Sequence, residues 1–240
     1  MEILHEKVDD IPLIISYLLK KKVNVYFDHY LGNHGNQNSL SNGEVVVIWL
    51  AYVLSQGDHR KAHVKEWFMS KRLTLESCLS KQEIDPNNFS DDRLTRLLYR
   101  CCQDDSWSFF ENALAKETLS LIPIDMMLET YFENEAISVI KGVFKLDSTA
   151  ISGSHEITEE GLMQFGYSKD YRPDLPQTKL MYCTEGFTGC SMVTEIDRGN
   201  VNDDLMYEPA LKRMRSVFNT EGSLYCGDSK MSIFRIREEI

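Results

Sequence analysis

The hydrophobic pattern of the chain changes near residue 141, and this change limits the folds that are open to it. Before that point, apolar residues mostly recur at helical spacing, as Leu94, Leu97 and Leu98 do. After it, short apolar runs alternate with glycines and polar turns, which is typical of β-strands. The sequence therefore predicts a mostly α-helical domain over residues 1–140 and an α/β domain over residues 141–240.

Within the first domain, helix signals and loop signals alternate. Two acids precede Ile11 and a proline follows it, so a helix is expected to begin there. Residues 32–43 are rich in Gly, Asn and Ser and predict a loop. Residues 44–55 are apolar nearly all round, which favours a buried helix and leaves a buried strand as the alternative. Further helices are expected after the capping residue Ser90 and over residues 125–138.

The second domain is expected to contain a strand, a hairpin, a helix, a strand and a helix, in that order. The first strand is predicted to be about six residues long. A loop with two glycines suits the hairpin. The expected elements are a strand over 141–147, hairpin strands over 179–184 and 190–196, a helix over 203–217, a strand over 223–226 and a helix from 231.

Two aspartates stand at the ends of predicted strands, Asp147 after the first and Asp228 after the last. They are 81 residues apart, so they converge only if their strands are neighbours. Carboxylate oxygens are the ligands that Mg²⁺ prefers, and two divalent ions about 4 Å apart can assist phosphodiester cleavage. Thr149 shares a strand face with Asp147, so a hydrogen bond to that carboxylate is expected. Since a single Asp after a strand is more often a turn former, the metal-site prediction depends on both aspartates.

Four segments carry a resemblance to a known family. They are Lys145-Leu-Asp-Ser-Thr149, residues 166–177 (Gly-Tyr-Ser-Lys-Asp-Tyr-Arg-Pro-Asp-Leu-Pro-Gln), Gly199-Asn-Val-Asn-Asp203 and Gly227-Asp-Ser-Lys-Met231. The order of these segments and their residues resemble the motifs of the DDE transposases of bacterial and archaeal insertion sequences. The resemblance implies an α/β core of the RNase H-like type, preceded by a helical domain that recognises the ends of the element.

The same resemblance implies metal-dependent cleavage of DNA strands and strand transfer at element ends. Asp147 and Asp228 would be the catalytic residues and the ligands of Mg²⁺ or Mn²⁺, double-stranded DNA the partner, and a homodimer the active complex. In this family the third carboxylate is a glutamate well beyond the second aspartate, and Glu238 and Glu239 lie too close to match it. We therefore expect an incomplete RNase H-like core, truncated before the third carboxylate. The alternative function is a non-catalytic remnant that binds DNA or dimerises.

The net charge of −11 opposes DNA binding through the electrostatic field of the whole protein. Any contact with DNA must therefore come from local clusters of basic residues. In the proline-containing segment, Lys169 and Arg172 can pair with phosphate oxygens, and the alternative is a rigid surface loop with solvated charges. In the basic run of the first domain, Arg60, Lys61 and Lys65 can follow a phosphate backbone. The alternative there is a domain that only supports the core or mediates dimerisation.

A haloacid-dehalogenase-like phosphatase is a further alternative, since Asp-Ser-Thr and Gly-Asp-Ser have similar outlines in that class. Its chemistry requires a second acid two residues after the nucleophile, where this chain has Thr149.

The location of the protein is also indicated by sequence. The first residues are acidic where a signal peptide would be basic, and the longest apolar runs are too short to span a bilayer. Six cysteines show no zinc-type spacing. We expect a cytoplasmic, nucleoid-associated protein that has no membrane partner.

Overall fold

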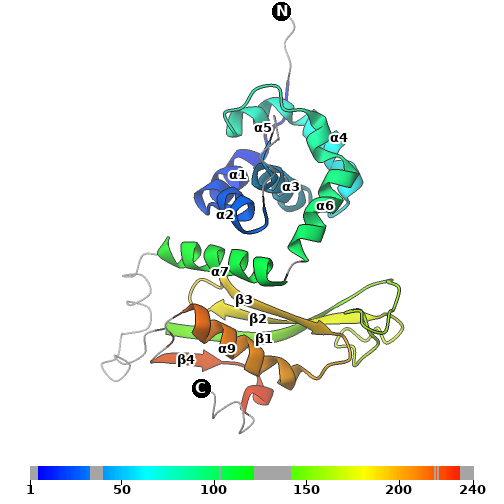
Figure 1. Ribbon diagram of the computed structural model, residues 1–240, viewed down its shortest axis with the longest axis vertical. Helices are drawn as coiled ribbons and strands as arrows, with labels where there is room; N and C mark the ends of the chain where they lie inside the picture. Colours follow the sequence, from blue (N-terminus) through cyan, green and yellow to red (C-terminus); the bar gives the residue numbers. More distant parts are fainter. Residues whose placement is uncertain are drawn as a thin grey trace, which may run out of the picture. The chain divides into compact units, whose positions relative to one another are not determined.

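The computed structural model describes residues 5–32, 40–102, 104–121, 142–218, 220 and 222–232. The chain divides into two compact units, Met1–Glu117 and Thr118–Ile240, which are described separately (Figure 1). The sequence placed the boundary near residue 140. The two divisions differ over residues 118–140, of which 122–140 lie outside the described part, and so does the helix expected over 125–138.

The described residues of the first unit form helices joined by turns. The α-helices are α1 (Ile11–Lys20), α2 (Val23–Tyr30), α3 (Asn42–Gln56), α4 (Val64–Ser70), α5 (Arg72–Cys78), α6 (Asp91–Cys101) and α7 (Asp104–Ser120), with short 3-10 turns η1 (Lys61–His63) and η2 (Pro86–Phe89). The predicted helix starts at Ile11 and after Ser90 are confirmed. The hydroxyl of Ser90 makes no capping hydrogen bond, and instead Asp91 and Asp92 place negative charge in the first turn of α6, where the helix dipole favours it.

Helix α3 is the buried centre of this unit, which confirms the helix prediction over the strand alternative. It begins with a capping box, in which the Ser41 hydroxyl accepts from the Glu44 amide while the Glu44 carboxylate accepts from the Ser41 amide. Its apolar residues pack against α1 and α2. A Cβ at Gly43 would lie 2.0 Å from the carbonyl oxygen of Asn24, so only glycine permits this approach of α2 and α3.

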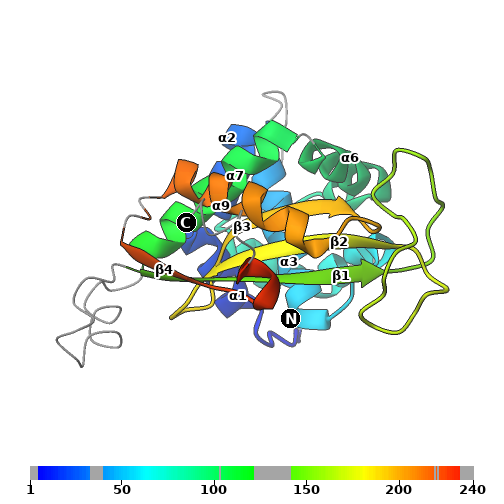
Figure 2. The ribbon, with the colours of Figure 1, turned by 90° about the horizontal axis from the view of Figure 1, so that it is seen from below.

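The second unit is a mixed four-stranded sheet with a helix across one face. The strands are β1 (Gly142–Ser152), β2 (Gln177–Glu185), β3 (Ser191–Arg198) and β4 (Ser223–Cys226). They lie in the order β3-β2-β1-β4, with β1, β2 and β3 antiparallel and β4 parallel to β1. The turn η4 (Asp203–Met206) leads into α9 (Tyr207–Val217), which packs on the sheet (Figure 2). The fold class is therefore mixed α/β, and the predicted hairpin, helix and last strand are confirmed.

One prediction in this unit needs correction, and a second lies mostly outside the described part. The first strand was expected to be about six residues long, but β1 has eleven. Its polar second half continues because Ser148 to Ser152 pair with Met181 to Gln177 of β2, so the backbone ladder extends the strand where side chains carry no apolar signal. At the end of the described part, residues Ser229–Ser232 form a short 3-10 turn, η5, and the remainder of the helix expected from 231 lies outside it.

Among the described residues, no helix combines the length and the apolar content needed to cross a bilayer.

The packing of the first unit can be tested on two leucines of α6. Leu94 is completely buried, whereas Leu98 is 45% exposed. Replacing Leu94 by Ala should lower the free energy of unfolding by about 2–5 kcal/mol, because the transfer energy is lost and a cavity remains. The matched change Leu98→Ala should cost less than about 1 kcal/mol. Urea denaturation followed by circular dichroism measures both, and equal losses would contradict the described packing.

Candidate active site

The register of β1 and β4 brings Asp147 and Asp228 to equivalent positions. The parallel ladder pairs Gly142 with Ser223, an offset of 81 residues (223 − 142), which is also the separation of the two aspartates (228 − 147). The two segments stay close beyond the last paired residues of β1 and β4, since a Cβ at Gly227 would lie 3.3 Å from the carbonyl oxygen of Leu146. Continued two residues past the last pair, Lys145 and Cys226, the same offset sets Asp228 opposite Asp147.

Both carboxylates lie at the surface. Burial alternates along β1, so that Lys145, Asp147 and Thr149 are exposed on one face while Leu146 and Ser148 are buried on the other. Asp228, just beyond β4, is exposed as well. Asp147 Oδ1 accepts a hydrogen bond from the amide of Ser148 at 2.8 Å. Among the described residues no hydrogen bond from the Thr149 hydroxyl to Asp147 is present, so that expectation is wrong.

A buried tyrosine donates a hydrogen bond to Asp228. Tyr207 begins α9 and is fully buried, yet its hydroxyl donates to Asp228 Oδ1 at 2.8 Å. Burial raises the pKa of Tyr207, and so do the hydrogen bond to Asp228 and the negative charges of Asp228 and Asp147. The phenol thus remains protonated and is held as a donor toward Asp228. Sequence reasoning missed Tyr207, since nothing in its local pattern distinguishes it from a core residue.

The segment 166–177 is held to the sheet by a lysine. Lys169 Nζ donates to the carbonyl oxygen of Ser148 at 2.8 Å and to its hydroxyl at 2.7 Å, and it pairs with Asp203 Oδ2 at 3.0 Å. Arg172 pairs locally with Asp174, where both side chains are more than half exposed. Of the two predicted phosphate contacts, Lys169 therefore anchors its segment next to Asp147, and Arg172 stays at the surface.

Asp203 is the centre of a buried polar network. Its side chain accepts from Lys179 Nζ at 2.6 Å and from the Ser148 hydroxyl at 3.0 Å, in addition to the Lys169 pair. Burial alone would raise the pKa of Asp203, but the hydrogen bonds from Lys179, Lys169 and Ser148 outweigh it and hold the pKa below its usual range. The network joins β1, β2, η4 and the segment 166–177 on the face behind Asp147.

The cations predicted in the first unit all have intramolecular partners. Arg60 Nε and Nη2 bond to the Asp58 carboxylate at 2.9 and 3.0 Å. Lys61 donates to the Thr95 hydroxyl and lies 3.5 Å from Asp91, and Lys65 donates to Asn87 Oδ1 at 2.9 Å. These partners, Asp58, Thr95, Asp91 and Asn87, come from the same unit. The basic run is thus partly neutralised, and its contact with DNA stays a prediction.

Within the described ranges, no group of three or more His, Cys, Asp or Glu side chains is arranged to hold a metal ion. The pair Asp147 and Asp228 supplies two carboxylates, and Glu238 and Glu239 lie outside these ranges.

Comparisons with protein-family models, with curated proteins and with solved structures found no match to this chain.

The buried network predicts a pH-dependent stability. Asp203 has a folded-state pKa below its unfolded value, so its stabilisation is complete above the unfolded pKa, about 3.9, and is lost as the pH falls further. Replacing Asp203 by Asn should lower the free energy of unfolding at pH 7 by about 3–5 kcal/mol, because Lys179 is left buried without its charge partner.

Urea denaturation at pH 7 and at pH 3 measures this effect, and the difference between wild type and Asp203→Asn should shrink at the lower pH. The control Asp174→Asn removes an exposed carboxylate and should leave the denaturation midpoint unchanged. A pH-independent difference for Asp203→Asn would show that its charge is not the cause.

Proposed function

We propose that this protein is a DNA transposase of the DDE type, which cleaves DNA strands at element ends and transfers them in a metal-dependent reaction. The observation that carries the proposal is the shared 81-residue offset between β1 and β4, which, continued two residues past the last pair of the ladder, sets Asp228 opposite Asp147. Two exposed carboxylates at neighbouring strand positions are suited to bind a divalent cation beside a phosphodiester. The resemblance of the four sequence segments supports the same reaction.

The donor set fits a hard cation. Asp147 and Asp228 offer only carboxylate oxygens, and both residues are exposed, so a cation that keeps several waters can be accommodated. These two residues would hold Mg²⁺ or Mn²⁺. When bound, such an ion supplies positive charge to the scissile phosphate and to the attacking and leaving oxygens.

Other residues of this chain keep the carboxylates in place. Tyr207 donates to Asp228 from the buried side and so fixes the orientation of that carboxylate. The amide of Ser148 does the same for Asp147. Lys169 ties the segment 166–177 to the backbone of β1 one residue beyond Asp147, which leaves Arg172 exposed in the same segment as a contact for phosphate oxygens.

The order of the elements supports an RNase H-like core for the second unit. An antiparallel arrangement of three strands is followed by α9 and by β4, which returns parallel to β1. This is the strand, hairpin, helix and strand order that the resemblance implies. In the proposal, the first unit contacts double-stranded DNA, the active complex is a homodimer, and the protein acts in the cytoplasm at the nucleoid.

A second candidate is a non-catalytic protein that binds DNA or dimerises. It is favoured by the number of ligands, because the described residues contain no group of three or more His, Cys, Asp or Glu side chains that could hold a metal ion. The two candidate functions differ in whether the wild-type protein cuts DNA.

The carboxylate pair is tested by nicking of supercoiled plasmid DNA. With Mg²⁺ or Mn²⁺, wild type should convert supercoiled to open-circular plasmid, and Asp147→Asn or Asp228→Asn should lower the rate by about 100-fold or more. The control Asp197→Asn removes a carboxylate from β3, at the opposite edge of the sheet, and should nick normally. A wild type that binds DNA without nicking it favours the non-catalytic candidate, and full activity of both Asn variants rules out this site.

The orienting role of Tyr207 is tested by its conservative replacement. Tyr207→Phe should raise the Mg²⁺ concentration for half-maximal nicking by about tenfold, because the hydrogen bond to Asp228 is lost. Tyr225→Phe is the matched control, since the Tyr225 hydroxyl is buried and has no hydrogen-bond partner in the described part of the chain. A change in unfolding free energy without a change in Mg²⁺ dependence would reduce Tyr207 to a core residue.

A further inference from the structure

The sheet of the second unit has one face that α9 leaves open. Helix α9 packs against β2 and β3 (Figure 2). Ser148 of β1 is buried, and its hydroxyl donates to Asp203 of η4, the turn that leads into α9. Lys145 and Asp147 alternate with Ser148 and are exposed on the opposite face. The side chains around Asp147 on that face are therefore the first groups that a substrate at this carboxylate meets.

Lys145 places a positive charge beside the carboxylate pair. Successive residues on one face of a strand are about 7 Å apart, so a lysine two residues before Asp147 can reach the space in front of that carboxylate. Across the strands, Lys145 pairs with Thr184 of β2 and with Cys226 of β4, and both partners lack an acidic group. Lys145 is exposed, and among the described residues no acidic side chain forms an ion pair with it.

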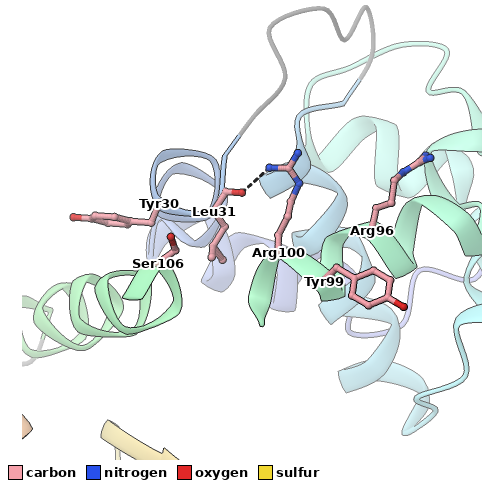
Figure 3. A pocket seen from close by; sticks show the side chains of 6 residues that line it. All are labelled: Tyr30, Leu31, Arg96, Tyr99, Arg100 and Ser106. Atoms are coloured by element: carbon pink, nitrogen blue, oxygen red, sulfur yellow. Dashed lines mark hydrogen bonds between the residues drawn. The ribbon is translucent and has the colours of Figure 1, made fainter. Parts of the chain in front are cut away.

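Other cations of the described chain are held by partners within it. Lys179 pairs with Asp203 at 2.6 Å. Figure 3 shows the same for Arg100 of the first unit, whose Nη1 donates to the carbonyl oxygen of Leu31 at 2.9 Å. Lys145 differs from them, because it lies on an open face and makes no such contact within the described ranges.

Tyr182 lies directly opposite Asp147. The antiparallel ladder pairs the two residues, so their Cβ atoms are about 4.5–5.5 Å apart on the same face. Of the nine residues of β2, Tyr182 alone is exposed. In the described part of the chain its hydroxyl has no hydrogen-bond partner. It is thus a donor next to Asp147 that no neighbouring side chain uses.

The charges of these groups match a phosphodiester. Two carboxylates and one divalent cation are neutral together, so a phosphodiester bound beside them leaves a single negative charge. The Lys145 ammonium balances that charge, and lysine binds phosphate as a compact point charge. A tyrosine hydroxyl is among the donors that contact DNA phosphates. Without the cation, the two carboxylates repel phosphate and one lysine cannot offset both.

We propose that Lys145 and Tyr182 bind oxygens of the DNA phosphate that lies at Asp147 and Asp228, Lys145 through its charge and Tyr182 through its hydroxyl. The inference rests on the proposed function, because that function supplies the phosphate. It assigns substrate binding to residues of β1 and β2 that are not themselves metal ligands.

The test is binding of a fluorescent random-sequence DNA duplex to the full chain, measured by anisotropy over a salt series with Ca²⁺ present. Ca²⁺ also takes carboxylate oxygens as ligands, and the measurement needs no cleavage. Lys145→Ala should weaken binding by about tenfold at low salt and reduce the slope of log K against log[salt] by about 1, because one phosphate contact is lost. With EDTA in place of Ca²⁺, this loss should shrink.

Two further variants separate the site from a general loss of charge. Lys145→Arg keeps the charge and should bind within about threefold of wild type. Lys212→Ala is the matched control, since it removes a lysine from α9, where Lys212 pairs with Glu208, and it should change affinity less than about twofold.

Tyr182→Phe removes only the hydroxyl. It should weaken binding by about threefold to tenfold and leave the salt slope unchanged, because a hydrogen bond is lost but no charge. The control Tyr167→Phe removes the hydroxyl of a tyrosine that is 80% exposed in the segment 166–177, and it should bind as wild type does.

Equal losses for Lys145→Ala and Lys212→Ala would mean a diffuse field and would overturn the inference, and so would unchanged affinity for Lys145→Ala. A loss for Lys145→Ala without one for Tyr182→Phe would remove the tyrosine from the site. If wild type binds no DNA, the proposed function fails together with the inference. If wild type binds and nicks DNA while both the Lys145 and the Tyr182 predictions fail, the proposed function stands without the inference.

Discussion

The parallel pairing of β1 with β4 is the constraint on which the candidate active site depends. Strand pairing is set by backbone hydrogen bonds, and a shift of one residue moves every side chain to the opposite face of the sheet. With the observed offset of 81, Asp147 and Asp228 fall on one level and both are exposed. The carboxylate pair is therefore a product of register, and α9 reinforces it through the hydrogen bond from Tyr207 to Asp228.

A second buried interaction supports that geometry from behind. Asp203 takes contacts from Lys179, from Lys169 and from the Ser148 hydroxyl, so four separate stretches of chain meet at one carboxylate. Such a network is costly to desolvate and contributes little net stability, but it specifies one arrangement because any other leaves a buried charge unpaired. In this unit it locks the segment 166–177 against β1.

The distribution of cations in the first unit follows a similar rule. Cations that lie near acids in the sequence form ion pairs within the unit, as Arg60 does with Asp58. Lys61 and Lys65 likewise contact Thr95, Asp91 and Asn87 of the same unit. Short-range fields depend on the nearest groups more than on net charge, so these intramolecular contacts weaken the positive field of the basic run.

Local pattern in the sequence determined the elements, and tertiary contacts decided the sites. The apolar run of α3, the hairpin of β2 and β3 and the strand β4 were predictable, because hydrophobic period and turn residues act over a few neighbours. The second half of β1 was not, since its strand conformation comes from pairing with β2. The two aspartates were identifiable as candidates, but their common level and the donor Tyr207 arise from residues far apart in the chain. Their proximity depends on register and helix packing, which no local pattern encodes.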